Sequence, residues 1–176
     1  MLSLSKRQLA REYRELYAVY DEGDTTETEL RAFYTLNPTK VGRYLNYGCG
    51  KWSKAIQILR ETGFDILGYD PTAGRGKFDF VISREETLRS MKFDGLVSNN
   101  LLEHLQDPVA TVRFMKSLIN DGGMMVHATP CYRYEYEYSR FHLFFFTGNS
   151  VNVMAHRVGL TVQDTKDPDI KIFVTA

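Results

Sequence analysis

The chain of 176 residues has the length of one folded domain, and its 43% hydrophobic and 25% charged residues are typical of a globular protein. Lysine plus arginine and aspartate plus glutamate both number 22, so no net charge attracts nucleic acid or an acidic membrane surface. The longest strongly apolar run, residues 143–146, is far too short to cross a membrane. Two cysteines and a charged first segment predict a cytoplasmic protein without a disulfide framework.

Two helices are predicted in an N-terminal segment, residues 1–40. Apolar side chains recur at three- and four-residue steps over residues 9–20, which indicates an amphipathic helix. Thr26 and Glu29 have the spacing of a capping box, in which each side chain bonds the backbone N–H of the other residue. A second helix is therefore expected to begin there and to end before Pro38, because a proline disfavours helical backbone at the residue before it.

From residue 41 to residue 176, short apolar runs alternate with helical stretches, which is typical of βαβ units and a parallel sheet. The predicted strands are residues 43–47, 65–69, 78–82, 94–98, 123–128, 160–164 and 170–175. The predicted helices are residues 52–62, 84–91, 108–119 and 150–158. The last two strands suit an antiparallel hairpin at the sheet edge. We therefore predict an α/β fold in a single domain: a doubly wound, mostly parallel Rossmann-like sheet with an antiparallel edge strand, preceded by two N-terminal helices.

One connection in this pattern is unusually short. Only residues 71–77 separate the second and third predicted strands, whereas a parallel crossover normally needs about a dozen residues or more. Because a crossover helix does not fit, either the third strand is very short or a bare loop carries the chain across the sheet. Gly74 and Gly76 suit such a loop.

The first strand runs into Gly48, Cys49 and Gly50 and then into a helix, at the position where open α/β sheets bind ligands. Glycines there let the backbone approach a ligand, and the helix that follows offers unpaired N–H groups. A tight turn without a ligand needs the same residues, so the turn alone indicates little. Asp70 strengthens the interpretation, because an acid at the end of the second strand can accept hydrogen bonds from the hydroxyls of an adenosyl ribose.

Two further features narrow the kind of ligand. A dinucleotide fingerprint has a third glycine three residues after Gly50, and the residue there is Ser53, so a dinucleotide is disfavoured. The fourth strand ends in polar Ser98, Asn99 and Asn100, which would form the other wall of the same crevice. Asparagine is also a good helix cap, so this strand end has a structural interpretation as well.

Together these elements resemble the class I S-adenosylmethionine-dependent methyltransferases. The likeness is to their small-molecule branch, which carries Glu-His-Leu-x-Asp-Pro after the fourth strand, here residues 103–108. It covers roughly residues 40–165. It is less specific over residues 141–162, where the family often has a histidine, an aromatic pair, a serine and a helix that closes at glycine. The resemblance implies S-adenosylmethionine as the cofactor and a small-molecule acceptor as the partner.

The cofactor contacts that the resemblance implies lie at the ends of the strands. In the family, the glycine turn lies beside the methionine part of the cofactor, and the acid that matches Asp70 holds the ribose. Residues that match Asn99 to Leu101 line the methyl end. The residues assigned to the cofactor in this way are Asn46, Tyr47, Gly48, Cys49, Gly50, Trp52, Asp70, Pro71, Ser83, Asn99, Asn100 and Leu101.

Two residues of the turn depart from the family pattern. Family members usually carry an acid where this chain has Asn46, and often a third glycine where it has Trp52. Asparagine can hydrogen-bond an ammonium group but offers no charge to offset it. Three functions are therefore considered: a small-molecule methyltransferase, a noncatalytic methyltransferase-like binding module, and a nicotinamide-dependent oxidoreductase, which Ser53 disfavours.

His142 and His104 are the candidate catalytic residues. A weak nucleophile such as a hydroxyl needs a base during methyl transfer, and imidazole titrates near neutral pH. His142 is preferred because it lies in the segment expected to cover the pocket. A structural hydrogen bond is the alternative role for both, and a structural or exposed position is expected for His127 and His156. No histidine and cysteine spacing resembles a metal site, so no metal is predicted.

The aromatic run Tyr132–Phe146 allows more than one interpretation. It could form a lid over an apolar or ring-shaped acceptor. Its first half alternates tyrosines with charged residues, which equally suits a half-exposed strand that pairs two copies of the chain as a homodimer. Residues 98–102 lack the aromatic-tipped loop with which base-directed amino methyltransferases clasp a flipped base, so DNA is not the expected substrate.

Overall fold

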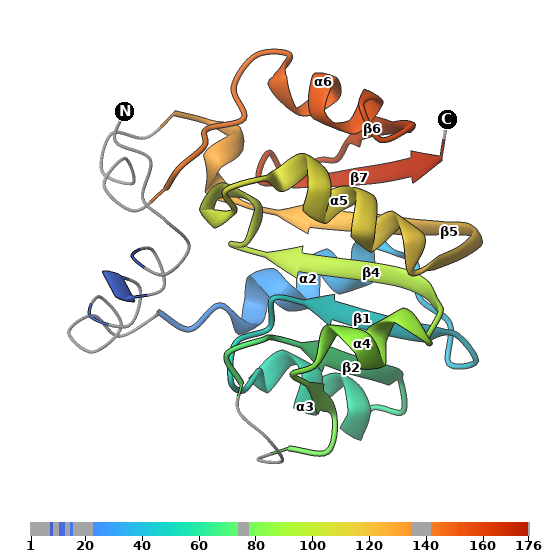
Figure 1. The fold of residues 1–176 in the computed structure, drawn as a ribbon. Coiled ribbons are helices and arrows are strands. Elements are labelled where there is room, and N and C mark those ends of the chain that lie inside the picture. Colours follow the sequence, from blue (N-terminus) through green and yellow to red (C-terminus); the bar gives the residue numbers. More distant parts are fainter. Residues whose placement is uncertain are drawn as a thin grey trace.

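Seven strands form one sheet in the computed structural model, which describes residues 8, 11, 12, 15, 23–73, 78–134 and 142–175. The strand order is β3-β2-β1-β4-β5-β7-β6 (Figure 1). The strands are β1 (Arg43–Tyr47), β2 (Asp65–Tyr69), β3 (Val81–Ile82), β4 (Phe93–Asn99), β5 (Ile119–Ala128), β6 (Leu160–Asp164) and β7 (Ile170–Thr175). Each overlaps a predicted strand, although β5 begins four residues earlier than predicted, at the residue where the preceding helix was expected to end. The predicted α/β fold is confirmed.

β7 is the strand that runs against the others. It pairs antiparallel with both β5 and β6, whereas the pairs from β3 to β5 are parallel. The predicted hairpin at this edge is therefore confirmed, and β7 is inserted between β5 and β6, so that β6 is the outermost strand. The sequence pattern predicts the hairpin but does not indicate which of its two strands pairs with β5.

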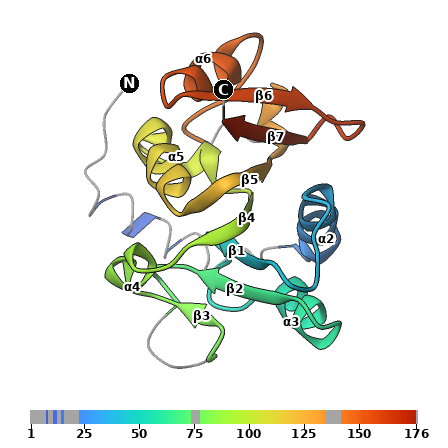
Figure 2. The ribbon, with the colours of Figure 1, turned by 90° about the vertical axis from the view of Figure 1, so that its right-hand side faces the viewer.

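Helices cover both faces of the sheet (Figure 2). One face carries α2 (Thr26–Thr35) and α3 (Lys54–Glu61), and the other carries α4 (Glu85–Arg89), α5 (Pro108–Ser117) and α6 (Ser150–His156). Two short 3-10 helices, η1 (Leu102–His104) and η2 (Pro130–Tyr132), follow β4 and β5. The bounds of α3 to α6 lie within two residues of the predicted ones. Within the described ranges, no helix is long and apolar enough to cross a membrane.

The N-terminal segment is described mainly through α2. The predicted helix over residues 9–20 falls almost entirely outside the described residues. The predicted capping box is wrong, because the helix begins one residue earlier, with Thr25 as its N-cap and without a side-chain cap. Glu29 therefore lies four residues after the N-cap, and its carboxylate accepts from the hydroxyl of Thr25 in place of the backbone N–H that a capping box would use.

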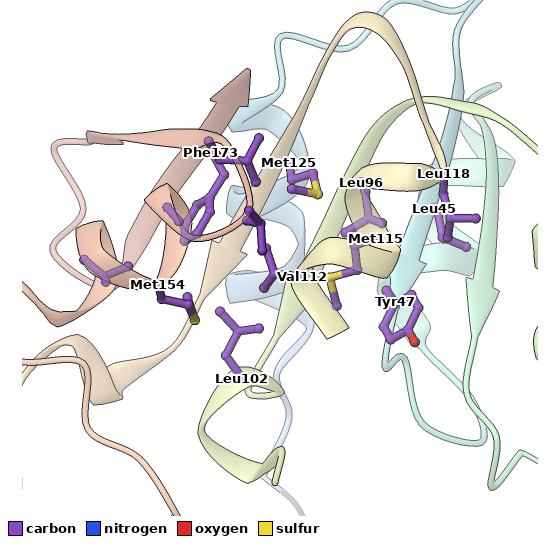
Figure 3. Packing of buried hydrophobic residues seen from close by; sticks show 14 of the residues in the cluster. Leu45, Tyr47, Leu96, Leu102, Val112, Met115, Leu118, Met125, Met154 and Phe173 are labelled. Carbon is purple, nitrogen blue, oxygen red and sulfur yellow. The ribbon is translucent and has the colours of Figure 1, made fainter. Parts of the chain in front are cut away.

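The core forms two layers, one on each face of the sheet. Figure 3 shows the larger layer, where Leu45 and Leu96 of the strands lie near Met115 of α5, and Phe173 of β7 lies on the side of Met154 of α6. Side chains alternate across a strand, so the residues next to Leu45 in β1 face the other way. Tyr44 accordingly packs in the second layer with α2 and α3. The same alternation directs Asn46 to the side of α2 and α3.

The sequence suggested that the short connection between β2 and β3 requires a very short third strand or a loop without a helix, and the described residues show both. Its described residues, 70–73 and 78–80, form turns and no helix, and β3 has only two residues. Gly74 and Gly76 lie outside the described residues. Because β1, β2 and β4 are parallel, their carboxyl ends meet at one edge of the sheet, where the polar residues singled out from the sequence are gathered.

Candidate active site

The turn after β1 has the backbone geometry that its glycines allow. Gly48 and Gly50 have φ angles of +83° and +69°, in the left-handed region that favours glycine. The N–H groups of Gly48 and Cys49 donate to the carbonyl of Tyr69, at 2.7 and 3.2 Å. A Cβ on Gly48 would lie 2.8 Å from Cδ1 of Leu101, whereas a Cβ on Gly50 would meet nothing within 4 Å. The turn is thus packed on the β4 side at Gly48 and open at Gly50.

Asp70 joins this turn to the end of β2. Its Oδ2 accepts a hydrogen bond from the N–H of Gly50 at 3.0 Å. Its Oδ1 accepts from both the N–H and the hydroxyl of Thr72, at 2.7 and 2.6 Å. A carboxylate has about four lone-pair sites, so Asp70 keeps acceptor capacity for a ligand hydroxyl after these three bonds.

Glu29 is a residue that the sequence pattern does not assign to the site. Its Oε2 accepts hydrogen bonds from Nδ2 of Asn46 and from the hydroxyl of Ser53, both at 2.7 Å. Its Oε1 accepts from the hydroxyl of Thr25 at 2.8 Å. Asn46 and Ser53 are each 2% exposed and lie at the two ends of the glycine turn. A carboxylate from α2 therefore lies at the site of the missing acid in β1.

The end of β4 offers an unusual polar group. Oδ1 of Asn99 is buried and has no hydrogen-bond partner within the described part of the chain. Such a buried acceptor is costly unless a ligand or water supplies a donor. Asn100 has a φ of +47°, which asparagine tolerates better than most residues, and its N–H donates to the carbonyl of Ala128 at 2.9 Å. β4 thus ends in a strained turn beside an unpaired acceptor.

The remaining predicted cofactor residues differ in how far their side chains are exposed. The side chain of Tyr47 is buried in the core, with its ring 4.7 Å from that of Tyr69, which leaves only its backbone for the predicted contact. Trp52 is 47% exposed beside the turn. Pro71 is exposed after β2, and Ser83 is half-buried after β3.

Cys49 lies in the middle of the glycine turn and is half-buried. Burial, and then the charges of Asp70 and Glu29, raise the pKa of its thiol well above the usual range. The thiol therefore keeps its proton, and it donates to the carbonyl of Gly50 at 3.4 Å. These contacts favour the role of a turn residue over that of a nucleophile.

The two candidate bases lie together. The rings of His104 and His142 meet edge to face, with centroids 4.7 Å apart. Nδ1 of His142 is 2.8 Å from Sγ of Cys131, which places a thiol beside the preferred base. Burial lowers the pKa of His142, and burial with the charge of Glu103 raises that of Cys131 to about 12. A neutral imidazole thus faces a protonated thiol at neutral pH.

Glu103 lies behind these histidines. It is fully buried, its Oε1 accepts from the hydroxyl of Thr129 at 2.6 Å, and its Oε2 has no partner within the described residues. Burial raises the pKa of Glu103 to about 7. Possible ligand atoms of Glu103, His104 and His142 all lie within 4.8 Å of one another, a grouping that could hold a metal ion. The spacing of these residues along the chain gives no sign of this grouping.

The side chains of the aromatic run differ in how deeply they are buried. Tyr132 and Phe146 are buried in the core, whereas Tyr134 and Phe144 are 60% and 37% exposed. The expected strand is not formed at Tyr132, which belongs to η2, and residues 135–141 lie outside the described residues. The N–H of Leu143 donates to the carbonyl of Glu103 at 2.7 Å. The last part of the run is therefore fixed against η1, beside the end of β4.

The two other histidines have the places expected for them. His127 is fully buried in β5, where its Nδ1 is 2.8 Å from the hydroxyl of Ser98 and its ring lies on Phe173. Burial lowers the pKa of His127 to about 3, so it stays neutral in the folded protein. His156 is exposed at the end of α6.

The fold of this chain is similar to that of solved S-adenosylmethionine-dependent methyltransferases. The methyltransferase domain family matches residues 9–165, so the chain belongs to that family. The resemblance to the class I enzymes is thereby confirmed. No curated protein sequence matches the chain.

Three solved structures illustrate the likeness. Magnesium protoporphyrin IX methyltransferase from Synechocystis PCC 6803, with bound S-adenosylmethionine, is 14% identical over 100% of both chains, with a TM-score of 0.59. CalO1, a methyltransferase of calicheamicin biosynthesis, is 15% identical over 97% of this chain and 58% of its own, with a TM-score of 0.61. A possible histamine N-methyltransferase from Thermotoga maritima is 17% identical over 94% of each chain, with a TM-score of 0.58. At these identities the likeness is one of fold.

Proposed function

We propose that this chain is an S-adenosylmethionine-dependent methyltransferase that acts on a small molecule. The observation that carries the proposal is the meeting of three strand ends at one edge: the open glycine turn, the carboxylate of Asp70 bonded to it, and the unpaired Oδ1 of Asn99. In open α/β sheets ligands bind beyond the carboxyl ends of the strands, which supports this edge as the place where the cofactor binds.

The residues present fit the cofactor. Asp70 would hold the ribose hydroxyls with its remaining acceptor capacity, and Oδ1 of Asn99 would receive a donor that no described residue supplies. The turn at Gly50 leaves room for close approach, since no atom lies near a Cβ there. When bound, S-adenosylmethionine supplies an electrophilic methyl group on a sulfonium, so the protein has mainly to align the acceptor.

His142 is proposed to take the proton of a hydroxyl acceptor. For Nε2 to accept that proton, Nδ1 must carry hydrogen and donate it to the sulfur of Cys131, which lies 2.8 Å away. His104 packs on the same ring and Glu103 lies behind both. An imidazole that gains a proton beside a buried carboxylate is stabilised as a cation, which lowers the barrier to proton transfer.

The acceptor is proposed to be a small apolar or ring-shaped molecule. Exposed Leu143 and Phe144 follow His142 in the chain, and the ring of Phe145 lies 6.1 Å from that of His142 and 4.9 Å from that of exposed Tyr134. Such surfaces bind apolar groups, and aromatic rings stack on them. A net charge of zero argues against nucleic acid or a membrane as partner, and we place the protein in the cytoplasm.

Transfer of label tests this function directly. The protein is incubated with methyl-tritiated S-adenosylmethionine and a fraction of cell extract below about 1 kDa, and products are separated by chromatography. Labelled small molecules are expected with the wild type and not with Asp70→Asn. Binding of the cofactor without any transfer would favour the noncatalytic module, and stabilisation by a nicotinamide dinucleotide alone would favour the oxidoreductase.

A further inference from the structure

The carboxylate of Glu29 lies where the cofactor turn has no acid of its own. Its three hydrogen-bond partners are neutral donors: the hydroxyls of Thr25 and Ser53 and the amide of Asn46. Among the described residues, no ion pair includes Glu29, and the nearby Lys54 is paired instead with Asp24 at 4.0 Å. Within the described part of the chain, the negative charge of Glu29 is therefore oriented by hydrogen bonds and is not neutralised by an ion pair.

This charge acts on the turn itself. Asn46 and Ser53 stand at the two ends of the turn and both donate to the same oxygen of Glu29, so that the carboxylate bridges β1 and the start of α3. Its field also reaches the middle of the turn, where it contributes to the raised pKa of the Cys49 thiol. An uncompensated carboxylate at a cofactor turn attracts a cationic group of the ligand.

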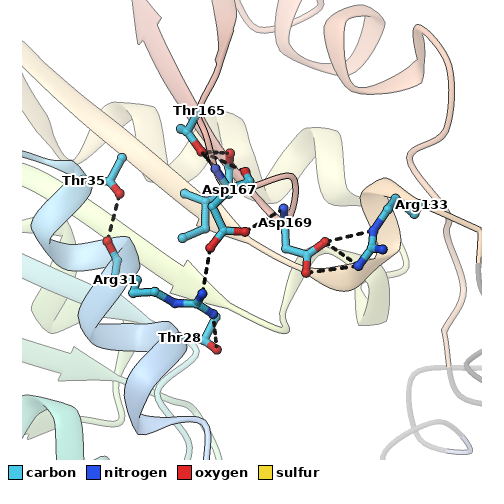
Figure 4. A network of polar contacts seen from close by, with 8 residues as sticks. Thr28, Arg31, Thr35, Arg133, Thr165, Asp167 and Asp169 are labelled. Atoms are coloured by element: carbon cyan, nitrogen blue, oxygen red, sulfur yellow. Dashed lines mark hydrogen bonds and ion pairs between the residues drawn. The ribbon is translucent and has the colours of Figure 1, made fainter.

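Holding α2 in place does not require Glu29. Ala32, Phe33 and Leu36 of the same segment are buried in the core, and the ring of Phe33 packs edge to face on Tyr44 with centroids 5.1 Å apart. Arg31 forms an ion pair with Asp167 at 3.1 Å, in the polar network of Figure 4. The carbonyl oxygen of a glutamine could accept the same bonds from Asn46 and Ser53. What the carboxylate adds is charge.

We propose that Glu29, reaching from α2, binds the ammonium group of the cofactor's amino-acid tail in place of an acid in β1. This inference rests on the proposed function and specifies one contact within it. Asn46 and Ser53 act as positioning residues, because their donors fix the orientation of the carboxylate. Asn46 is then no sign of lost activity, since the charge it lacks comes from the neighbouring helix.

Two ligands separate this contact from the rest of the site. S-adenosylhomocysteine carries the ammonium group, whereas 5′-methylthioadenosine has the same nucleoside and thioether but no amino-acid tail. Dissociation constants are measured by calorimetry for the wild type, Glu29→Gln, and a control, Glu27→Gln, on the exposed side of the same helix. Glu29→Gln is expected to weaken S-adenosylhomocysteine about 10- to 100-fold and to leave 5′-methylthioadenosine unchanged, because only a charge-assisted bond is lost.

A third variant moves the charge back to the strand. In the double variant Glu29→Gln with Asn46→Asp, the affinity for S-adenosylhomocysteine is expected to recover most of the loss. Equal weakening of both ligands by Glu29→Gln, or no weakening of either, would overturn the inference. A wild type that binds neither ligand would overturn the proposed function itself. Thermal unfolding of each variant, expected within about 2 °C of the wild type for an exposed or isosteric change, checks the fold.

Discussion

The proposed active site has two halves, one for the cofactor and one for the acceptor, and these are built in different ways. The cofactor half, around Gly48 and Asp70, is held by short-range bonds from backbone N–H groups at adjacent strand ends. The acceptor half is assembled from side chains far apart in the sequence: His104 from η1, Cys131 from η2, and His142 from the segment before α6. The comparison teaches that one half follows from the order of the strands, whereas the other depends on long-range packing between separate segments.

The largest expected effect separates chemistry from binding in the acceptor half. His142→Gln should lower kcat by about 10²- to 10⁴-fold for a hydroxyl acceptor, since a general base contributes that much, while the affinity for S-adenosylhomocysteine stays unchanged. Rates are measured with the acceptor found by label transfer, and His156→Gln, at an exposed position of α6, is the control.

A metal-dependent rate would change the role assigned to the cluster of Glu103, His104 and His142. If a chelator abolishes the activity of the wild type and a divalent ion restores it, Glu103, His104 and His142 act as metal ligands and not through an imidazole base. We expect the rate to be the same with and without the chelator.

The second-largest expected effect is a loss of cofactor affinity when Asp70 is changed. Asp70→Asn should weaken S-adenosylhomocysteine about 100-fold, because it removes a charged acceptor from the turn N–H of Gly50 and from the ligand. Asp65→Asn, at the other end of β2 in an exposed ion pair with Arg43, should leave the affinity unchanged. Equal affinities of wild type and Asp70→Asn in calorimetry would show that the ribose lies elsewhere.

His127, buried in β5, makes the stability of the folded protein depend on pH. Burial lowers the pKa of this histidine from its ordinary value of 6.5 to about 3, so the unfolded chain binds more protons between these values. The contribution is fully present above about pH 6.5 and is lost as the pH falls toward 3. The free energy of unfolding should drop by about 2 kcal/mol more between pH 7 and 5 in the wild type than in His127→Gln, as measured by urea denaturation.

The smallest effect compares the two glycines of the turn. Both have positive φ angles, so alanine at either should cost about 1–2 kcal/mol of unfolding free energy. Gly48→Ala should cost more than Gly50→Ala, because its Cβ would press on Leu101. Denaturant titrations of both variants give the difference. A larger loss for Gly50→Ala would contradict the packing of Gly48 on the β4 side.

The sequence could predict the strand ends that form the proposed cofactor half, because the signals for them are local. The turn at Gly48 to Gly50, Asp70 at the end of β2 and the strand that ends at Asn99 each follow an apolar run in the chain. Parallel strands bring such ends together whatever the loops do. The family match over residues 9–165 bears out the resemblance that these residues indicated.

The contacts that the sequence did not predict are those made between distant elements. The spacing of Glu29 suggests a capping box, and only the docking of α2 on the sheet brings its carboxylate to Asn46. Cys131 meets His142 because the segment before α6 folds back on η1, which no local pattern indicates. Burial of Glu103 likewise depends on long-range packing, which spacing along the chain does not encode.

The most direct test of the central claim is a crystal structure of the protein grown with S-adenosylhomocysteine. The account predicts the ribose hydroxyls on Asp70, the ammonium group on Glu29, and the sulfur turned toward Leu101 and the histidine pair. A ligand found away from the carboxyl ends of β1, β2 and β4, or protein crystals free of it at saturating concentration, would contradict the account.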